Sequence, residues 1–190
     1  FMENLRIPES ELIINPDGSI YHLHLKPENL ASVVFTVGDP DRVALVSKYF
    51  DQVDFKISKR EFVTHTGWKN GKRVTVMSTG MGTDNIEILM TELDALVNVD
   101  LATREIKAEK TSLQIIRLGT SGSMQKDLPV GSLLASEIGI GMDTLMVYYP
   151  ELAGDQSLAI AIQSELDLSF LPYQASASST LFENLDQEFV

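Results

Sequence analysis

The strongest constraint on the fold is an apolar, β-branched run at residues 112–118, which ends in a turn of small residues at 119–122. A run of this length bounded by turn residues is typical of a buried β-strand. The run carries one cation, Arg117. Because a buried charge is costly unless an anion meets it, Arg117 pairs either with a carboxylate of the fold or with an anionic ligand. Open α/β sheets bind ligands beyond the carboxyl ends of their strands, which is where this pattern puts Arg117 and Thr120.

Two further segments combine a strand, a glycine turn and the start of a helix. Residues 32–37 form an apolar run that enters Gly-Asp-Pro-Asp-Arg at 38–42, in which Asp39 is a candidate N-cap. A later strand enters Thr-Gly-Met-Gly at 79–82, and apolar residues at helical spacing follow over 86–97. Turns of this kind expose backbone amides that can bind an anion, although an ordinary capped helix start has the same pattern. The order of these units predicts an α/β fold.

The rest of the sequence predicts further strands, a hairpin turn and another helix. Alternation over residues 53–68 predicts one or two strands, and Asn70 with Gly71 predicts a two-residue hairpin turn before the returning strand. Residues 133–138 predict another strand, and residues 157–168 predict a helix. The other expected features are a short extended segment at 21–25, a capping box formed by Asp84 and Glu87, and a polar surface excursion at 98–111.

The length of 190 residues predicts one domain. Residues 1–20 contain few apolar groups in register and two prolines, so we expect an N-terminal extension there. Residues 21–190 are then expected to form a single α/β domain.

Composition excludes several classes of function. A formal net charge of −12 argues against general binding to nucleic acid or to anionic membranes, both of which require basic patches. The absence of cysteine excludes disulfides and cysteine chemistry and is consistent with the cytoplasm. The three histidines lack zinc-site spacing, and the sequence has no dinucleotide fingerprint, Walker A motif or serine-hydrolase elbow. We therefore expect a cytoplasmic protein without a metal site.

Four short motifs occur in one order along the chain: Gly-Asp-Pro-Asp-Arg at 38–42, Ser-Lys-Arg-Glu-Phe at 58–62, Ser-Thr-Gly-Met-Gly at 78–82 and Arg-Leu-Gly-Thr-Ser-Gly at 117–122. In this order and spacing they resemble the nucleoside phosphorylase-I family, most closely its uridine phosphorylase branch, over about residues 20–140. The resemblance implies a three-layer α/β sandwich in which helices flank a central mixed, partly barrel-like β-sheet. It also implies a pentosyltransferase of pyrimidine salvage that splits uridine or a related nucleoside with phosphate.

The resemblance implies a role for individual residues. Catalysis is implied for Arg117 and Thr120, and phosphate binding for Gly38, Arg42, Arg60, Arg117 and Thr120. Nucleoside binding is implied for His22, Thr79, Met81, Gly82 and Phe182. Family members form hexamers built from dimers, in which Arg60 would reach the phosphate and His22 the ribose 5′-hydroxyl of the neighbouring subunit. Inorganic phosphate is then a co-substrate, and no metal or organic cofactor is expected.

Three alternatives stay open at this point. A purine nucleoside phosphorylase shares most of these motifs, and a nucleosidase would use water in place of phosphate. Family members continue beyond the position of Val190 with residues that bind the ribose hydroxyls and read the base, so we expect the C-terminal part of the domain to be missing. If the 190 residues are the whole chain, a non-catalytic phosphate- or nucleoside-binding remnant is the third alternative.

Overall fold

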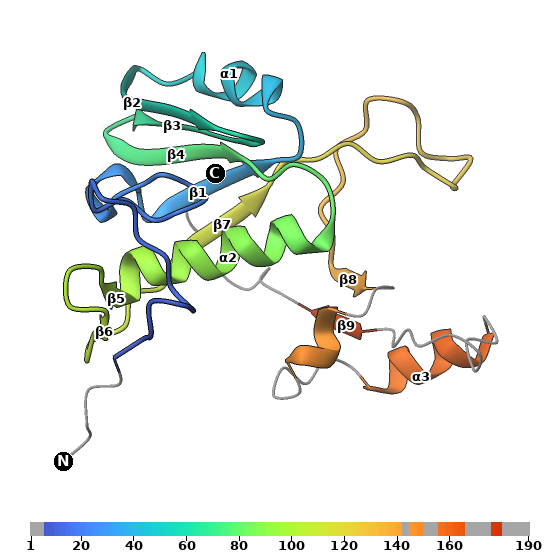
Figure 1. The fold of residues 1–190 in the computed structure, drawn as a ribbon. Helices are drawn as coiled ribbons and strands as arrows, with labels where there is room; N and C mark the ends of the chain where they lie inside the picture. The colour runs from blue at the N-terminus through green and yellow to red at the C-terminus, as the bar shows by residue number, and fades with distance from the viewer. Residues whose placement is uncertain (1–5, 142–144, 150–155, 166–175, 180–190) are drawn as a thin grey trace. The chain divides into compact units, whose positions relative to one another are not determined.

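The computed structural model describes residues 6–141, 145–149, 156–165 and 176–179. The chain divides into two compact units, Phe1–Ser121 and Gly122–Val190. The first unit contains η1 (Pro27–Asn29), β1 (Val33–Val37), α1 (Asp41–Ser47), β2 (Gln52–Lys59), β3 (Phe62–Lys69), β4 (Lys72–Ser78), α2 (Thr83–Asn98), β5 (Val99–Asp100), β6 (Glu105–Ile106) and β7 (Gln114–Arg117) (Figure 1). The second contains β8 (Ile138–Gly141), η2 (Leu145–Tyr148), α3 (Gln156–Glu165) and β9 (Ser176–Ser179), with β8 antiparallel to β9.

A five-stranded mixed sheet with the order β2-β3-β4-β1-β7 organises the first unit. Strand β1 runs parallel to both β4 and β7, whereas β3 is antiparallel to β2 and to β4. Residue Thr36 pairs with Arg117, and Val37 pairs with Ser78. The carboxyl ends of β1, β4 and β7 therefore meet at one edge of the sheet, and the loops that follow these strands leave from that edge (Figure 1).

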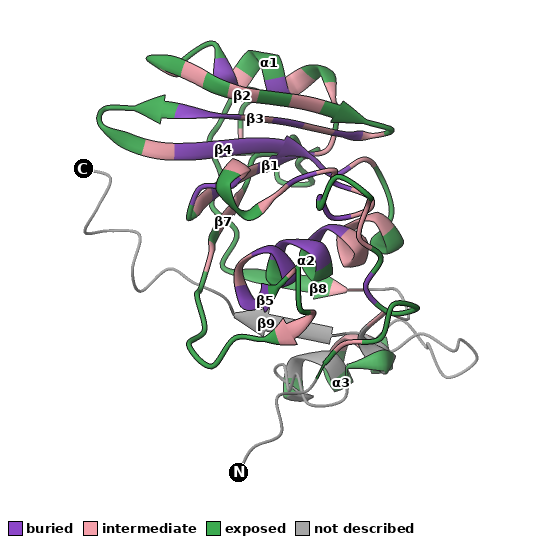
Figure 2. Cartoon of the chain, turned by 60° about the vertical axis from the view of Figure 1, so that its left-hand side comes forward, coloured by how far each residue is buried: buried purple, intermediate pink, exposed green. Residues whose placement is uncertain are grey.

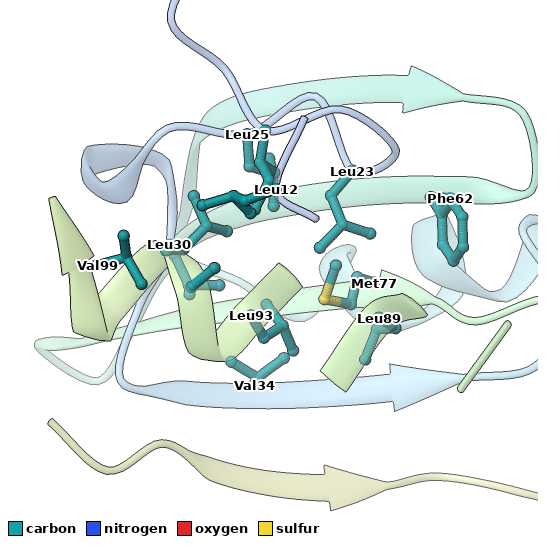
Figure 3. Packing of buried hydrophobic residues seen from close by; sticks show 13 residues of the cluster. Leu12, Leu23, Leu25, Leu30, Val34, Phe62, Met77, Leu89, Leu93 and Val99 are labelled. Atoms are coloured by element: carbon teal, nitrogen blue, oxygen red, sulfur yellow. The ribbon is translucent and has the colours of Figure 1, made fainter. Parts of the chain in front are cut away.

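One face of the sheet packs against α2 and the N-terminal segment. Val34 of β1, Met77 of β4 and Phe62 of β3 are buried there with Leu89 and Leu93 of α2 (Figure 3). In α2 the buried residues fall on one side and the exposed residues on the other (Figure 2). Full burial of each such side chain stabilises the fold by about 1.5–3 kcal/mol, so this cluster is the main core of the unit.

The opposite face of the sheet packs against α1. Val37 of β1, Val76 of β4 and Val43 of α1 form a second buried cluster there. Successive strand residues point to opposite faces, and the neighbours Val76 and Met77 belong to different clusters. Helices α1 and α2 therefore cover opposite faces of the sheet. This arrangement confirms the predicted mixed sheet flanked by helices, while its partly barrel-like shape stays a prediction.

Several local predictions are confirmed. Strand β1, helix α2 and helix α3 lie where the patterns predict them. Between β3 and β4, Asn70 has φ 49° and Gly71 has φ 74°, as the predicted two-residue hairpin turn requires.

Other local predictions are wrong. Among the described residues β7 pairs only with β1, so it is an edge strand whose residues are half-buried or exposed. The strand predicted at 133–138 begins only at Ile138, and residues 132–136 have no regular structure. Residues 21–23 form a turn in place of an extended segment. Helix α2 has Gly82 as its N-cap without a side-chain cap, so the predicted capping box does not form.

The N-terminal segment contributes to the core of the first unit. Leu12 and Ile20 are buried in the main cluster, and the Ile7 amide donates to the Arg104 carbonyl at 2.9 Å. Residues 98–111, predicted as a surface excursion, carry the β5–β6 hairpin. The predicted boundary between residues 20 and 21 stays a prediction, and the contacts within the chain divide it after Ser121.

His65 makes the stability of this unit depend on pH. Its Nδ1 lies 2.7 Å from Oγ of Ser47 in α1, and burial together with Lys56 lowers its pKa below the ordinary 6.5. At a pH between the folded-state pKa of His65 and 6.5, the unfolded chain binds more protons at this residue than the folded chain does. The free energy of unfolding therefore falls as the pH drops through this interval. We expect His65→Gln to lose more stability relative to the native chain at about pH 7.5 than at about pH 5.5 in urea denaturation.

Lys56→Gln is the matched variant for this test, because Lys56 is the cross-strand neighbour of His65. Removing the lysine charge raises the pKa of His65 and should weaken the pH dependence. A stability difference between the native chain and His65→Gln that does not change with pH contradicts the assignment.

Candidate active site

The turn after β1 places Arg42 at the edge where the parallel strands end. The Asp39 carboxylate accepts from the Asp41 amide at 2.9 Å, and the Asp39 carbonyl accepts from the Arg42 amide at 3.1 Å. The N-cap of α1 is Pro40, so Asp39 stabilises the turn from one residue further out than predicted. This turn fixes the direction in which the Arg42 side chain leaves the helix.

The end of β7 brings Thr120 to Arg42. The Leu118 amide donates to the Thr36 carbonyl at 2.8 Å, which holds the chain after Arg117 against β1. Arg42 Nη2 then donates to Thr120 Oγ1 at 3.4 Å. Two residues that are 78 positions apart in the sequence are thus in contact.

The Arg117 guanidinium occupies space that two glycines leave open. A Cβ at Gly38 would lie 3.9 Å from Arg117 Nη2, and a Cβ at Gly119 would lie 2.5 Å from Arg117 Nη1. Any side chain at position 119 would displace the guanidinium. Arg42, Arg117 and Thr120 therefore converge at one edge of the sheet.

Within the described part of the chain, the positive charge of this cluster has no carboxylate partner. Among the residues that the structure describes, no carboxylate forms an ion pair with Arg42 or Arg117. The sequence allowed Arg117 either a carboxylate of the fold or an anionic ligand as its partner. The described part of the chain shows no such carboxylate. Two guanidinium groups and a hydroxyl at one edge of a sheet can bind an oxyanion through charge-assisted hydrogen bonds.

The loop between β4 and α2 lies beside the cluster. The Gly80 carbonyl oxygen would be 3.9 Å from a Cβ at Gly38, and the buried Thr79 donates its amide to the Val37 carbonyl at 2.8 Å. Gly80 at φ 67° and Gly82 at φ 99° adopt left-handed backbone that favours glycine. Met81 between them is 91% exposed, so the loop presents an apolar side chain to solvent.

Arg60 stands at the same edge without contacting the other two arginines. It lies in the β2–β3 turn at φ 54°, and the next residue, Glu61, accepts from Ser78 Oγ at 2.6 Å through its carbonyl. Ser78 Oγ also accepts from the Val63 amide at 2.7 Å, which fixes the turn to the end of β4. The Arg60 side chain is exposed there.

His22 is held at a different place. Its ring and amide contact Glu92, which lies about 13 Å along the axis of α2 from Thr83, at a rise of about 1.5 Å per residue. No contact in the described part of the chain joins His22 to Arg42 or Arg117. Phe182 lies outside the described residues.

The structure thus brings together Gly38, Arg42, Arg117, Thr120 and Thr79, and the predicted residues Met81 and Gly82 lie in the loop that follows Thr79. The sequence interpretation missed the supporting residues Ser78, Gly80, Gly119 and Glu92. Gly80 and Gly119 lie inside the motifs and were identifiable as positions of close approach. Ser78 also lies inside a motif, at 78–82, whereas Glu92 carries no signal in the sequence, because its contacts are made only in the fold.

Two features are absent from the described residues. No helix among them has the length and apolar character needed to cross a membrane. Within the same residues no three side chains of the metal-binding types gather into a cluster.

Comparison with known proteins places the chain in a family. The model of the Phosphorylase superfamily matches residues 32–187. Uridine phosphorylase from Thermococcus kodakarensis is 29% identical over 151 residues, which are 77% of this chain and 49% of the relative. A DeoD-type purine nucleoside phosphorylase from Streptococcus suis is 33% identical over 118 residues, which are 61% of this chain and 44% of the relative.

A solved structure supports the same placement. The crystal structure of a Trypanosoma brucei nucleoside phosphorylase, described as showing uridine phosphorylase activity, has a TM-score of 0.78 and 34% identity to this chain. The likeness covers 89% of this chain and 57% of that protein. The chain spans about half the length of the curated relatives it matches. With the family model matched over residues 32–187, the chain belongs to the Phosphorylase superfamily.

Proposed function

We propose that this protein catalyses the reversible phosphorolysis of uridine to uracil and ribose 1-phosphate. The observation that carries the proposal is the convergence of Arg42, Arg117 and Thr120, without a carboxylate partner among the described residues, at the carboxyl ends of parallel strands. Curated relatives from Thermococcus kodakarensis and Escherichia coli that bear the name uridine phosphorylase support the choice of nucleoside.

In the proposed mechanism Arg42 and Arg117 hold inorganic phosphate beneath the anomeric carbon. Gly38 lets the backbone approach the anion, and Thr120 bridges phosphate and ribose. A phosphate oxygen forms a bond to C1′ as the bond from C1′ to N1 of uracil breaks, and the departing base takes up a proton. The transition state resembles an oxocarbenium ion, which the anionic phosphate stabilises. Phosphate is the co-substrate, and the proposal needs no metal or organic cofactor.

The nucleoside would lie over the loop after β4. Thr79, Met81 and Gly82 line this position, and a sugar or base would cover the exposed Met81 side chain. Arg60 and His22 are proposed to act in the neighbouring subunit of a homo-oligomer, because neither contacts Arg42 or Arg117 among the described residues. We also propose a cytoplasmic location for the protein.

The test is phosphate-dependent release of uracil by the full chain. We expect uracil and ribose 1-phosphate to form from uridine only when phosphate is present. Release of uracil without phosphate would instead indicate a nucleosidase. No product from any nucleoside, with phosphate bound, would indicate a binding protein without catalytic activity.

A purine nucleoside phosphorylase is the second candidate, favoured by the 33% identity to the Streptococcus suis enzyme. Among the described residues we assign candidates for phosphate and for the nucleoside, but none that selects a pyrimidine over a purine. Comparison of kcat/KM for uridine and inosine decides between the two. A higher value for inosine contradicts the proposed pyrimidine preference.

A further inference from the structure

The buried carboxylate of Glu92 binds the backbone of a loop in the N-terminal segment. Glu92 of α2 is 7% exposed, and its oxygens accept from the His22 amide at 3.0 and 3.1 Å and from the Leu23 amide at 2.8 Å. The ends of the loop are joined by the Ile20 amide, which donates to the Leu25 carbonyl at 2.8 Å. Two backbone amides thus converge on one carboxylate, as in an anion-binding nest. Burial of this charge is tolerated because these hydrogen bonds replace its hydration.

The same carboxylate determines how the His22 ring is presented. His22 Nδ1 lies 2.7 Å from Glu92 Oε1, and an ionised carboxylate can only accept a hydrogen bond. The neutral ring must therefore carry its proton on Nδ1, which leaves Nε2 as an acceptor. Tyr21 packs edge-on against the ring with centroids 4.7 Å apart, and 28% of the His22 side chain stays exposed.

We propose that Glu92 is a positioning residue that holds His22 in the Nδ1–H tautomer, so that Nε2 accepts a hydrogen bond from a hydroxyl group of the nucleoside sugar. This inference rests on the proposed phosphorolysis and on His22 acting at the nucleoside. Glu92 itself does not touch the substrate. It acts through the ring and through the loop that carries the ring.

The first measurement is the tautomer of His22 by ring-nitrogen NMR of the full chain at about pH 8, where an ordinary histidine is neutral. We expect Nδ1 protonation in the native chain. Glu92→Gln replaces one acceptor oxygen by a donor, so the Nδ1–H population of His22 should fall. His24, which pairs with Asp17 at 3.3 Å, and His65 are internal controls whose signals should not change.

The second measurement is the steady-state kinetics of uridine phosphorolysis. Loss of one hydrogen bond to the sugar raises KM for uridine by about tenfold with a smaller effect on kcat. We expect this change in His22→Ala and in Glu92→Gln, and no further increase in the double variant. His24→Gln, a change in the same loop, should leave KM unaltered.

The outcomes separate this inference from the proposed function. If the native chain releases uracil but Glu92→Gln leaves the His22 tautomer or KM unchanged, the positioning role is wrong and the proposed function stands. If KM rises in Glu92→Gln but not in His22→Ala, Glu92 has only a structural role. If the native chain neither binds nor splits uridine, both the function and this inference are overturned.

Discussion

Replacement of Arg117 by glutamine is expected to lower kcat/KM for uridine phosphorolysis by about a thousandfold. An arginine about 4 Å from phosphate contributes up to about 4 kcal/mol at the effective dielectric of a protein surface, which is about three decades in rate if it acts in the transition state. The free energy of unfolding should change little, because Arg117 is exposed and forms no ion pair among the described residues. Steady-state kinetics at saturating phosphate measures the effect.

The matched control for this prediction is Arg6→Gln. Arg6 is an exposed arginine whose side chain contacts only the Thr103 carbonyl and Glu9 among the described residues, so its replacement should leave kcat/KM unchanged. A loss of less than about tenfold in Arg117→Gln would mean that Arg117 does not act on the reacting groups in the transition state.

Gly67→Ala is expected to destabilise the first unit by about 3 kcal/mol. A Cβ at this position would lie 2.1 Å from the Gln52 carbonyl oxygen and 2.9 Å from the Val53 Cα. Both atoms belong to the backbone of β2, next to the register shift between Val53 and Phe55, so they cannot move without breaking strand pairing. A loss of this size is a large fraction of the stability of a typical domain, about 5–15 kcal/mol.

Urea denaturation measures this loss as a lower midpoint with an unchanged slope. Gly139→Ala is the control, since a Cβ there would meet no described atom within 4 Å. We expect the control to change the free energy of unfolding by no more than about 0.5 kcal/mol. An equally small change in Gly67→Ala would show that β2 and β3 are not paired as described.

Local periodicity and turn chemistry predicted several elements correctly. Strand β1, the hairpin at Asn70 and Gly71, and helix α2 each follow from side-chain spacing or turn chemistry. Residues 133–137 have a similar apolar character but form no strand, because a strand also requires a neighbour to pair with. For the same reason the pattern at β7 could not show whether the strand lies at the edge or in the middle of a sheet.

The convergence of the arginines was predictable in outline, since parallel strands end at the same edge of a sheet. The contact between Arg42 and Thr120 then depends on the register of β1 against β7, which the sequence does not specify. The pairing of His22 with Glu92 was not predictable. Glu92 lies on the buried side of an amphipathic helix, where periodicity alone predicts an apolar residue.

A crystal structure of the full chain grown with phosphate tests most directly whether guanidinium groups from helix α1 and strand β7 share one oxyanion. We expect a single phosphate about 3 Å from Arg42, Arg117 and Thr120. Phosphate bound elsewhere, or held by one arginine while the other points away from it, would contradict it.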